Sequence, residues 1–243
     1  MPRSNDLSVA AGSGNPPVIV VTGMAFEARI ARGEGVEVVY AARADLLERA
    51  LSAAVARGCS GIVSFGTAGG LAPDLQPGAL IVADAVAGPF GRIPTDAAWA
   101  DRLAAALSEG PLAPRLQRGP MAAVAAPLMS ADDKRALHRS TGALAVDMES
   151  HLAGAVAAAR GVPFAVCRAI VDPAWRTLPS AATAGLRDDG STALAPILRE
   201  LMRQPSQIGA LLQIALDARA ARLSLVQARQ AFGAARALNM RVA

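Results

Sequence analysis

The chain has 243 residues, a hydrophobic content of 53% with only 3% aromatic residues, and a formal net charge of +4. This length suits one large α/β domain, and the two cysteines and two histidines argue against a disulfide framework, a cysteine nucleophile and a histidine-rich metal site. The basic charge lies in residues 201–243, so the nearly neutral remainder gives no indication of a nucleic-acid partner.

Residues 1–17 are polar and lack the apolar stretch of a signal peptide. No uninterrupted apolar run approaches the ~20 residues that a membrane-spanning helix requires. We therefore expect a cytoplasmic protein in which residues 1–15 form a flexible N-terminus.

Apolar runs rich in Val and Ile alternate along the chain with alanine-rich stretches of helical spacing. Strands are predicted at residues 18–21, 36–40, 61–65, 79–86, 121–126, 143–146 and 163–171. Loops are predicted at 88–96 and 173–187, and helices at 44–57, 97–108, 131–139, 149–160 and 191–240, the last with a break at 204–206. This order predicts one α/β domain at residues 16–204, with a mixed, mostly parallel sheet flanked by helices, and a helical extension at 205–243.

Acidic side chains stand where two of the predicted strands end. Asp147 and Glu149 follow the strand at residues 143–146, and Asp172 follows the strand at 163–171. Because the carboxyl ends of strands in an open α/β sheet line a common cleft, these acids can converge on one site. Such a set suits chemistry in which one acid holds a hydroxyl group and another handles a proton.

Five segments in order resemble the purine nucleoside phosphorylase and methylthioadenosine/S-adenosylhomocysteine nucleosidase superfamily. They are residues 22–27 (TGMAFE), 65–71 (FGTAGGL), 75–82 (LQPGALIV), 146–150 (VDMES) and 168–172 (RAIVD). The closest resemblance is to the hopanoid-associated phosphorylases, or adenosylhopane nucleosidases, through the arginine-rich tail and residues 134–138 (KRALH), 141–144 (TGAL) and 172–179 (DPAWRTLP). The resemblance implies a nucleoside phosphorylase-like fold and cleavage of the bond between ribose and a purine.

By this resemblance Asp172 protonates or hydrogen-bonds N7 of the departing purine, and Glu27 matches the acid that activates water in the nucleosidases. A dry site would keep the proton on Asp172 by raising its pKa. The residue type alone leaves a second role open, since an aspartate at a strand end also caps turns.

The sugar and the base are assigned to other segments by the same resemblance. Glu149 matches the carboxylate that binds the ribose hydroxyls, and Met148 matches the apolar floor beneath the ribose. Met129 and Ser130 match the region that touches the purine. A first-turn glutamate favoured by the helix dipole and a core methionine remain alternatives for Glu149 and Met148.

The sequence does not decide whether the nucleophile is water or phosphate. A hydrolase needs a base such as Glu27 to prepare water, whereas a phosphorylase binds phosphate through N–H groups and arginines. A predicted glycine-rich turn suits either nucleophile through Gly66, Thr67, Ala68 and Gly69, although tight turns need glycine in any case. Where relatives carry a glycine-rich segment this chain has Arg43, so phosphorolysis is not established. We expect no cofactor and no metal, with inorganic phosphate as an alternative co-substrate.

The tail after Pro205 has apolar residues at an approximately helical spacing, and Arg222, Arg229 and Arg236 recur every seven residues as one stripe. Such a helix can lie on an anionic membrane surface. Adenosylhopane, a nucleoside on a large hydrocarbon, would have to be met at a membrane. A helix packed on its own domain or on a partner subunit fits the same pattern.

The sequence therefore predicts an enzyme that removes adenine from adenosylhopane and gives ribosylhopane or its 1-phosphate. We expect it on the inner face of the membrane as a peripheral protein and, as in the family, as a homo-oligomer. One alternative is a methylthioadenosine or S-adenosylhomocysteine nucleosidase, which the tail and the Asp172-Pro173 context disfavour. The other is a non-catalytic nucleoside-binding or membrane-scaffold protein, which the presence of all three acids disfavours.

Overall fold

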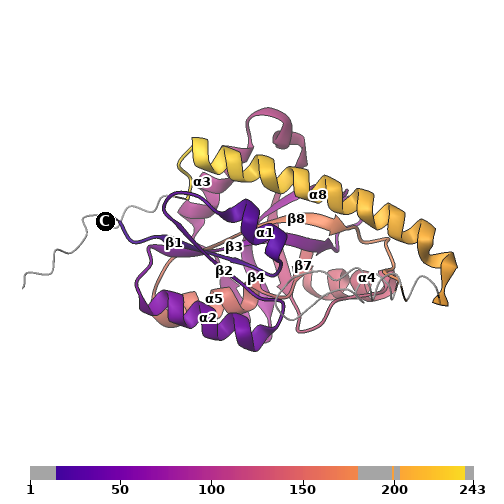
Figure 1. Cartoon of the computed structure of the whole chain (residues 1–243), viewed down its shortest axis with the longest axis horizontal. Coiled ribbons are helices and arrows are strands. Elements are labelled where there is room, and N and C mark those ends of the chain that lie inside the picture. Colours follow the sequence, from indigo (N-terminus) through magenta and orange to yellow (C-terminus); the bar gives the residue numbers. More distant parts are fainter. Residues whose placement is uncertain (1–14, 180–198, 200–202, 239–243) are drawn as a thin grey trace, which may run out of the picture.

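The computed structural model describes residues 15–179, 199 and 203–238 of the chain (Figure 1). Within these residues eight strands join in one sheet: β1 (Val18–Thr22), β2 (Val36–Tyr40), β3 (Gly61–Gly70), β4 (Leu80–Gly88), β5 (Gly91–Pro94), β6 (Leu116–Ala123), β7 (Ala145–Asp147) and β8 (Phe164–Asp172). Each of the seven predicted strands overlaps one of them. The eighth, β5, lies inside a segment that was predicted as a loop, and it pairs antiparallel with β4.

Five of the strands close into a ring. β3 pairs with β7, β7 with β6, β6 with β4, β4 with β8, and β8 returns to β3. β1 extends the sheet from β3 in parallel, and β2 lies parallel to β1. The sheet is therefore mixed and closed like a small barrel, and β1 and β2 extend it outward from β3, with β2 at the edge.

The prediction of a mostly parallel sheet is wrong, since β3–β7, β4–β8 and β4–β5 are antiparallel. The connection from β3 to β4 spans residues 71–79, which is too short for the crossover that a parallel return requires. β4 therefore runs opposite to β3, and β8, parallel to β3, must meet β4 in an antiparallel sense. Alternation of strands and helices does not reveal this reversal.

The glycine-rich segment that was predicted as a turn is the second half of β3. This part of the strand pairs with β8 on one side and with β7 at its end. A Cβ atom on Gly66 would lie 2.8 Å from both the Arg168 guanidinium and the Glu27 carboxylate. Glycine is thus needed for the close approach of two charged side chains rather than for a turn.

The helices are α1 (Ala25–Ala31), α2 (Ala44–Ala56), α3 (Ala97–Leu107), α4 (Ala131–Thr141), α5 (Ser150–Arg160) and α8 (Ile208–Ala234), with short 3₁₀ turns at Gly110–Arg115 and Pro205–Gln207. Only α1 was not predicted, because seven residues are too few to show a clear helical period. The first part of the predicted helix at 191–240 lies largely outside the described residues. α2 to α5 begin and end close to the predicted bounds.

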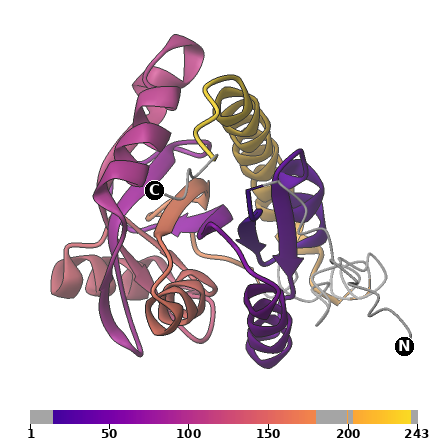
Figure 2. The same ribbon diagram turned by 90° about the vertical axis from the view of Figure 1, so that its left-hand side faces the viewer.

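Helices cover both faces of the sheet, with α8, α1 and α3 on one side and α2 and α5 on the other (Figures 1 and 2). The alternation within β1 produces this division, since Ile19 and Val21 join the core beneath α2 and α5. Val18 and Val20 join the core beneath α3 and α8. Successive side chains of a strand point to opposite faces, so one apolar strand supplies both cores.

The C-terminal helix packs on its own domain. α8 buries Ala221, Leu225, Ala228 and Phe232 in the core it shares with α3, and the Trp99 indole donates a hydrogen bond to the Ala237 carbonyl at 2.9 Å. The predicted arginine stripe does not stay on one free face, because half-buried Arg229 donates to the Ala31 carbonyl at 2.9 Å. No helix in the described ranges is long and apolar enough to cross a bilayer.

We predict that Leu225→Ala lowers the free energy of unfolding by about 2–5 kcal/mol, because a fully buried leucine leaves a cavity. Leu223→Ala on the same helix removes a side chain that is 52% exposed, so it should cost under about 1 kcal/mol. Urea unfolding of both variants measures the difference. Equal costs would contradict the packing of α8 into the core.

Candidate active site

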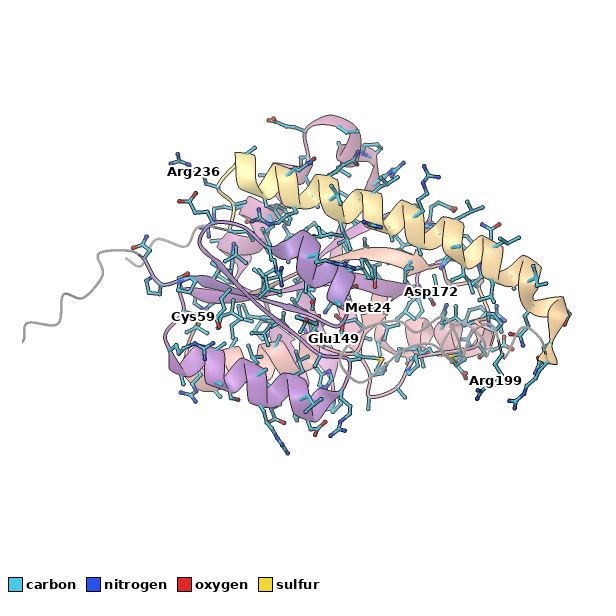
Figure 3. The ribbon with its side chains drawn as sticks, in the orientation of Figure 1. Met24, Cys59, Glu149, Asp172, Arg199 and Arg236 are labelled. Carbon is cyan, nitrogen blue, oxygen red and sulfur yellow. The ribbon has the colours of Figure 1, made fainter. Side chains whose placement is uncertain are left out.

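A cavity of about 280 Å³ opens where β1, β3, β7 and β8 approach one another. The predicted polar side chains that line it are Glu27 on α1, Thr67 on β3, Asp147 on β7, Glu149 at the N-cap of α5 and Asp172 on β8. Figure 3 shows Met24, Glu149 and Asp172 in the same part of the molecule. A larger cavity of about 590 Å³ lies beside Arg229 and contains none of the predicted site residues.

Glu27 is buried and accepts hydrogen bonds on both carboxylate oxygens. One oxygen takes the Thr67 N–H at 2.8 Å and the Thr67 hydroxyl at 2.7 Å. The other takes the N–H groups of Gly23 and Met24 at 3.2 and 3.1 Å. Of the residues that the sequence offered to an external nucleophile, Thr67 therefore already directs its N–H group and its hydroxyl at a carboxylate of the protein itself.

Arg168 lies in the middle of β8 with its side chain 1% exposed. Its Nε is 2.8 Å from an Asp147 oxygen, an ion pair rather than a well-aligned hydrogen bond, and its Nη2 is 3.2 Å from a Glu149 oxygen. The guanidinium also donates to the Ser64 hydroxyl at 2.5 Å and to the Thr67 carbonyl at 3.3 Å. One cation thus connects β3, through Ser64 and the Thr67 carbonyl, with the acids at the end of β7 and at the start of α5.

Asp147 lines the cavity and forms the ion pair with Arg168. Its carboxylate accepts the Ser150 N–H at 3.2 Å and the Ser150 hydroxyl, so it caps the beginning of α5 while it holds Arg168. With its proton directed at Asp147, the Ser150 hydroxyl oxygen accepts from the Ser64 hydroxyl at 2.9 Å. The role of Asp147, which the sequence left uncertain, is therefore to fix the orientation of the Arg168 guanidinium.

Glu149 turns into the cavity beside Gly23. A Cβ atom on Gly23 would lie 2.4 Å from a Glu149 oxygen, so a side chain at this position would displace the carboxylate. Burial raises the pKa of Glu149 to about 7, with Arg168 opposing and the charges of Asp147 and Glu27 adding to the rise. Met148, the predicted apolar floor, lines the same cavity.

Asp172 ends β8 at the cavity with its side chain 13% exposed. Burial raises the pKa of Asp172 above its ordinary value, and the nearby Lys134 ammonium opposes that rise. The Lys134 Nζ lies 2.5 Å from Oδ2 of Asp172. A partly desolvated carboxyl group of this kind can hold a proton at a pH where an exposed aspartate cannot.

The structure does not bring every predicted residue to the cavity. Ser130 instead caps α4 by accepting the Asp133 N–H at 3.0 Å, and the Met129 carbonyl accepts the Leu178 N–H at 2.8 Å. Their neighbours Pro127 and Leu128 form the wall in that region. Thr67, Ala68 and Gly69 line the cavity as part of β3, with Gly66 just behind them.

Two charged residues received no role from the sequence. Arg168 stands within an apolar strand, and an arginine in such a place needs a buried acid as partner. Lys134 lies on α4, which is otherwise polar, and nothing in its local sequence signals burial. Arg43, the departure from the family pattern, is exposed and pairs with Asp45 at the start of α2.

Comparisons with known proteins agree with this architecture. The profile of the Phosphorylase superfamily matches residues 3–202. No curated protein matches the chain in sequence.

Several solved structures are similar in fold. A 5'-methylthioadenosine/S-adenosyl homocysteine nucleosidase from Helicobacter pylori has a TM-score of 0.65 at 17% identity, covering 92% of this chain and 99% of that one. Futalosine hydrolase of Helicobacter pylori gives 0.57 at 19% identity, covering 65% and 88%. S-adenosylhomocysteine nucleosidase from Streptococcus pyogenes gives 0.59 at 18%, covering 68% and 86%. At such identities the likeness concerns the fold.

The raised pKa of Glu149 has a consequence for stability. The unfolded chain releases this proton near pH 4.5 and the folded chain near pH 7, so deprotonation in that window favours the unfolded state. Stability that is present below pH 4.5 should fall as the pH rises to 7, by on the order of 2–3 kcal/mol. Glu149→Gln should remove this part of the decline in urea unfolding, and Glu48→Gln on the exposed face of α2 should not. An identical pH dependence in all three proteins would contradict the burial of an ionisable Glu149.

Proposed function

Since the chain belongs to the Phosphorylase superfamily and is an enzyme of the nucleosidase or nucleoside phosphorylase type, we propose that it releases a purine base from a nucleoside by hydrolysis. One observation carries the proposal: a single cavity holds Glu27, Glu149 and Asp172, each in a different environment. Glu27 accepts four hydrogen bonds, Glu149 adjoins a buried arginine, and Asp172 adjoins a buried lysine. These environments suit a base, a sugar ligand and an acid.

The sugar is the part of the substrate that becomes positive. As the N-glycosidic bond breaks, the electron pair moves to the purine and the ribose carries cationic charge. The ionised Glu149 accepts hydrogen bonds from vicinal ribose hydroxyls and stabilises that charge. Arg168, behind Glu149, fixes the carboxylate without reaching into the sugar site, and Met148 supplies an apolar floor.

The base leaves more easily if it gains a proton. In the proposed reaction Asp172 gives its proton to N7 of the purine as the electron pair arrives at N9, so adenine departs as a neutral molecule. The apolar side chains of Val124, Pro127, Leu128 and Leu178 line the cavity and offer flat contacts for the purine ring. Burial, which keeps the proton on Asp172, supports this role.

The nucleophile is proposed to be water. Glu27 takes a proton from water while the water oxygen bonds to C1′ of the ribose, which completes a balanced hydrolysis. A phosphate dianion would need the Thr67 and Gly23 N–H groups, which Glu27 already occupies, and would be repelled by its charge. Arg168 is committed to Asp147 and Glu149, so it is not placed to bind phosphate.

We expect adenine release from adenosine-type substrates to be indifferent to inorganic phosphate, and the ribose product to carry ¹⁸O at C1 after reaction in H₂¹⁸O. Glu27→Gln and Asp172→Asn should each lower kcat by about 10²–10⁴-fold, since each removes one proton-transfer group. Chromatography of the products with mass detection measures both quantities. Ribose 1-phosphate as the product would establish phosphorolysis and refute the assignment of Glu27.

For the substrate, we propose a purine nucleoside with a large hydrocarbon at C5′, as in adenosylhopane, met as a peripheral protein at the cytoplasmic face of a membrane. The sequence resemblance around Lys134 and Asp172 supports it. So does the N-terminal end of α8, which extends beyond the sheet and, among the described residues, leaves Ile208, Leu212 and Leu216 exposed by 49, 64 and 60% (Figure 1). Residues 208–216 carry no charge, and arginines flank them on both sides. Such a segment fits insertion among lipids with cations at the headgroups.

Double replacement Leu212→Glu/Leu216→Glu should lower turnover of adenosylhopane in vesicles of phosphatidylcholine and phosphatidylglycerol by at least about tenfold, because two apolar anchors are lost. Turnover of soluble 5'-methylthioadenosine should not change. Leu46→Glu on α2, on the opposite side of the molecule, is the control.

Two outcomes would refute this substrate. Rapid turnover of methylthioadenosine with none of adenosylhopane would favour the thioadenosine nucleosidase. A change of oligomeric state in light scattering for the double variant, with vesicle turnover intact, would make the end of α8 a contact between subunits of a homo-oligomer.

A further inference from the structure

The partner of the proposed acid is the only lysine of the chain. Of 24 lysine and arginine residues, Lys134 alone is a lysine. Its side chain is 1% exposed and comes from the first turn of α4. A sequence that uses arginine at every other basic position has a lysine at the one place where a cation touches Asp172. The properties that distinguish lysine from arginine should therefore matter there.

The surroundings of the Lys134 ammonium match those properties. Its three N–H donors meet three oxygens, at 2.5 Å for Asp172 Oδ2, 3.0 Å for the Arg176 carbonyl and 3.2 Å for the Pro173 carbonyl. A compact ammonium can satisfy three acceptors that converge on one atom, whereas a planar guanidinium spreads its donors along a fork. Two of these acceptors belong to the segment directly after β8, so Lys134 fixes both the carboxylate and the backbone that follows it.

We propose that Lys134 is the positioning residue that orients Asp172 and sets its acid strength for delivery of a proton to the leaving purine. This inference rests on the proposed function. Lys134 engages Oδ2 of Asp172 and leaves Oδ1 for N7. When the Oδ1 proton moves to N7 and the glycosidic electron pair moves to N9, Asp172 becomes a carboxylate. The ammonium at 2.5 Å stabilises that new charge, and Lys134 keeps its own three protons throughout.

Few other charges act on Asp172. Asp217 faces it from α8 and opposes ionisation, although Arg176 pairs with Asp217 at 2.8 Å and offsets its charge. Burial disfavours the carboxylate, and the Lys134 ammonium is the main group favouring it. Removal of the ammonium should therefore raise the pKa of Asp172 further, making it a weaker acid that holds its proton to higher pH.

The test is the pH profile of kcat/KM for adenine release by Lys134→Met. The alkaline limb, where Asp172 loses its proton, should move up by about 1–3 pH units, and the plateau should fall about 100-fold. Lys134→Arg should keep the limb near its wild-type position, because the charge remains. Arg135→Met, beside Lys134 on α4, removes an exposed arginine that pairs only at the surface with exposed Asp132, so it is the matched control and should leave the plateau within about threefold of wild type.

A substrate whose leaving group needs no proton distinguishes a loss of acid strength at Asp172 from general damage to the site. Turnover of p-nitrophenyl riboside by Lys134→Met should stay within a few-fold of wild type, because nitrophenolate departs as an anion. An unchanged alkaline limb, or equal losses on the riboside and on adenosine, would refute the proposal and leave Lys134 a purely structural residue.

The single lysine allows a second measurement that does not depend on activity or on the folding of a Lys134 variant. Labelling with [ε-¹³C]lysine gives one side-chain signal in the wild-type protein. Its titration should shift in Asp172→Asn, which removes the negative partner, and should not shift in Arg135→Met, which changes only the surface of α4. An unchanged titration in Asp172→Asn would refute the coupling. If the enzyme released no purine from any nucleoside, the proposed function would fail, while this titration would still decide whether the pair exists.

Discussion

The site depends on one buried cation. Arg168 has no contact with solvent, yet it is surrounded by the carboxylates of Asp147 and Glu149 and by the hydroxyl of Ser64. Removal of one member of such a buried set typically costs about 3–5 kcal/mol, because the others are left uncompensated. Without the guanidinium, like charges close together would hold protons in preference to ionising. In the proposed reaction, Arg168 thus allows Glu149 to present a carboxylate to the sugar.

Glycines at two positions allow charged groups to approach one another closely, because a glycine has no side chain to occupy the space. Gly66 makes room for Glu27 and Arg168 on one side of β3, and Gly23 makes room for Glu149. The closed ring of strands then brings the ends of β7 and β8 to the same wall as β3. Backbone geometry and glycine placement therefore fix the spacing of the acids, and the one acid outside a strand or helix, Glu149, lies in the two-residue connection between β7 and α5.

The sequence was sufficient for the parts governed by local pattern. Apolar runs located seven strands, and the acids at strand ends were found because strand ends converge. It failed where the cause is non-local. The predicted strand ended at residue 65, so the short connection at 71–79 that reverses β4 was not recognised, and the place of β8 between β3 and β4 is a long-range pairing. Burial of Lys134 follows from a contact 38 residues away, and the glycines of β3 resembled a turn because the side chains they admit come from other elements.

The charges of the cavity also bear on the choice between hydrolysis and phosphorolysis, which would both use Asp172 as the proposed acid. Glu27, Glu149 and Asp172 line the cavity, and Lys134 is the basic residue found with them among the lining residues that the structure describes. The Lys134 ammonium already donates to three oxygens. It could not bind an incoming anion without leaving Asp172 without its cationic partner. A surplus of carboxylates stabilises a ribosyl cation and repels phosphate. In the proposed hydrolysis, the arrangement that favours departure of the base would also favour a neutral nucleophile over an anionic one, because Glu27 already accepts hydrogen bonds on both oxygens from the N–H groups that could bind an anion.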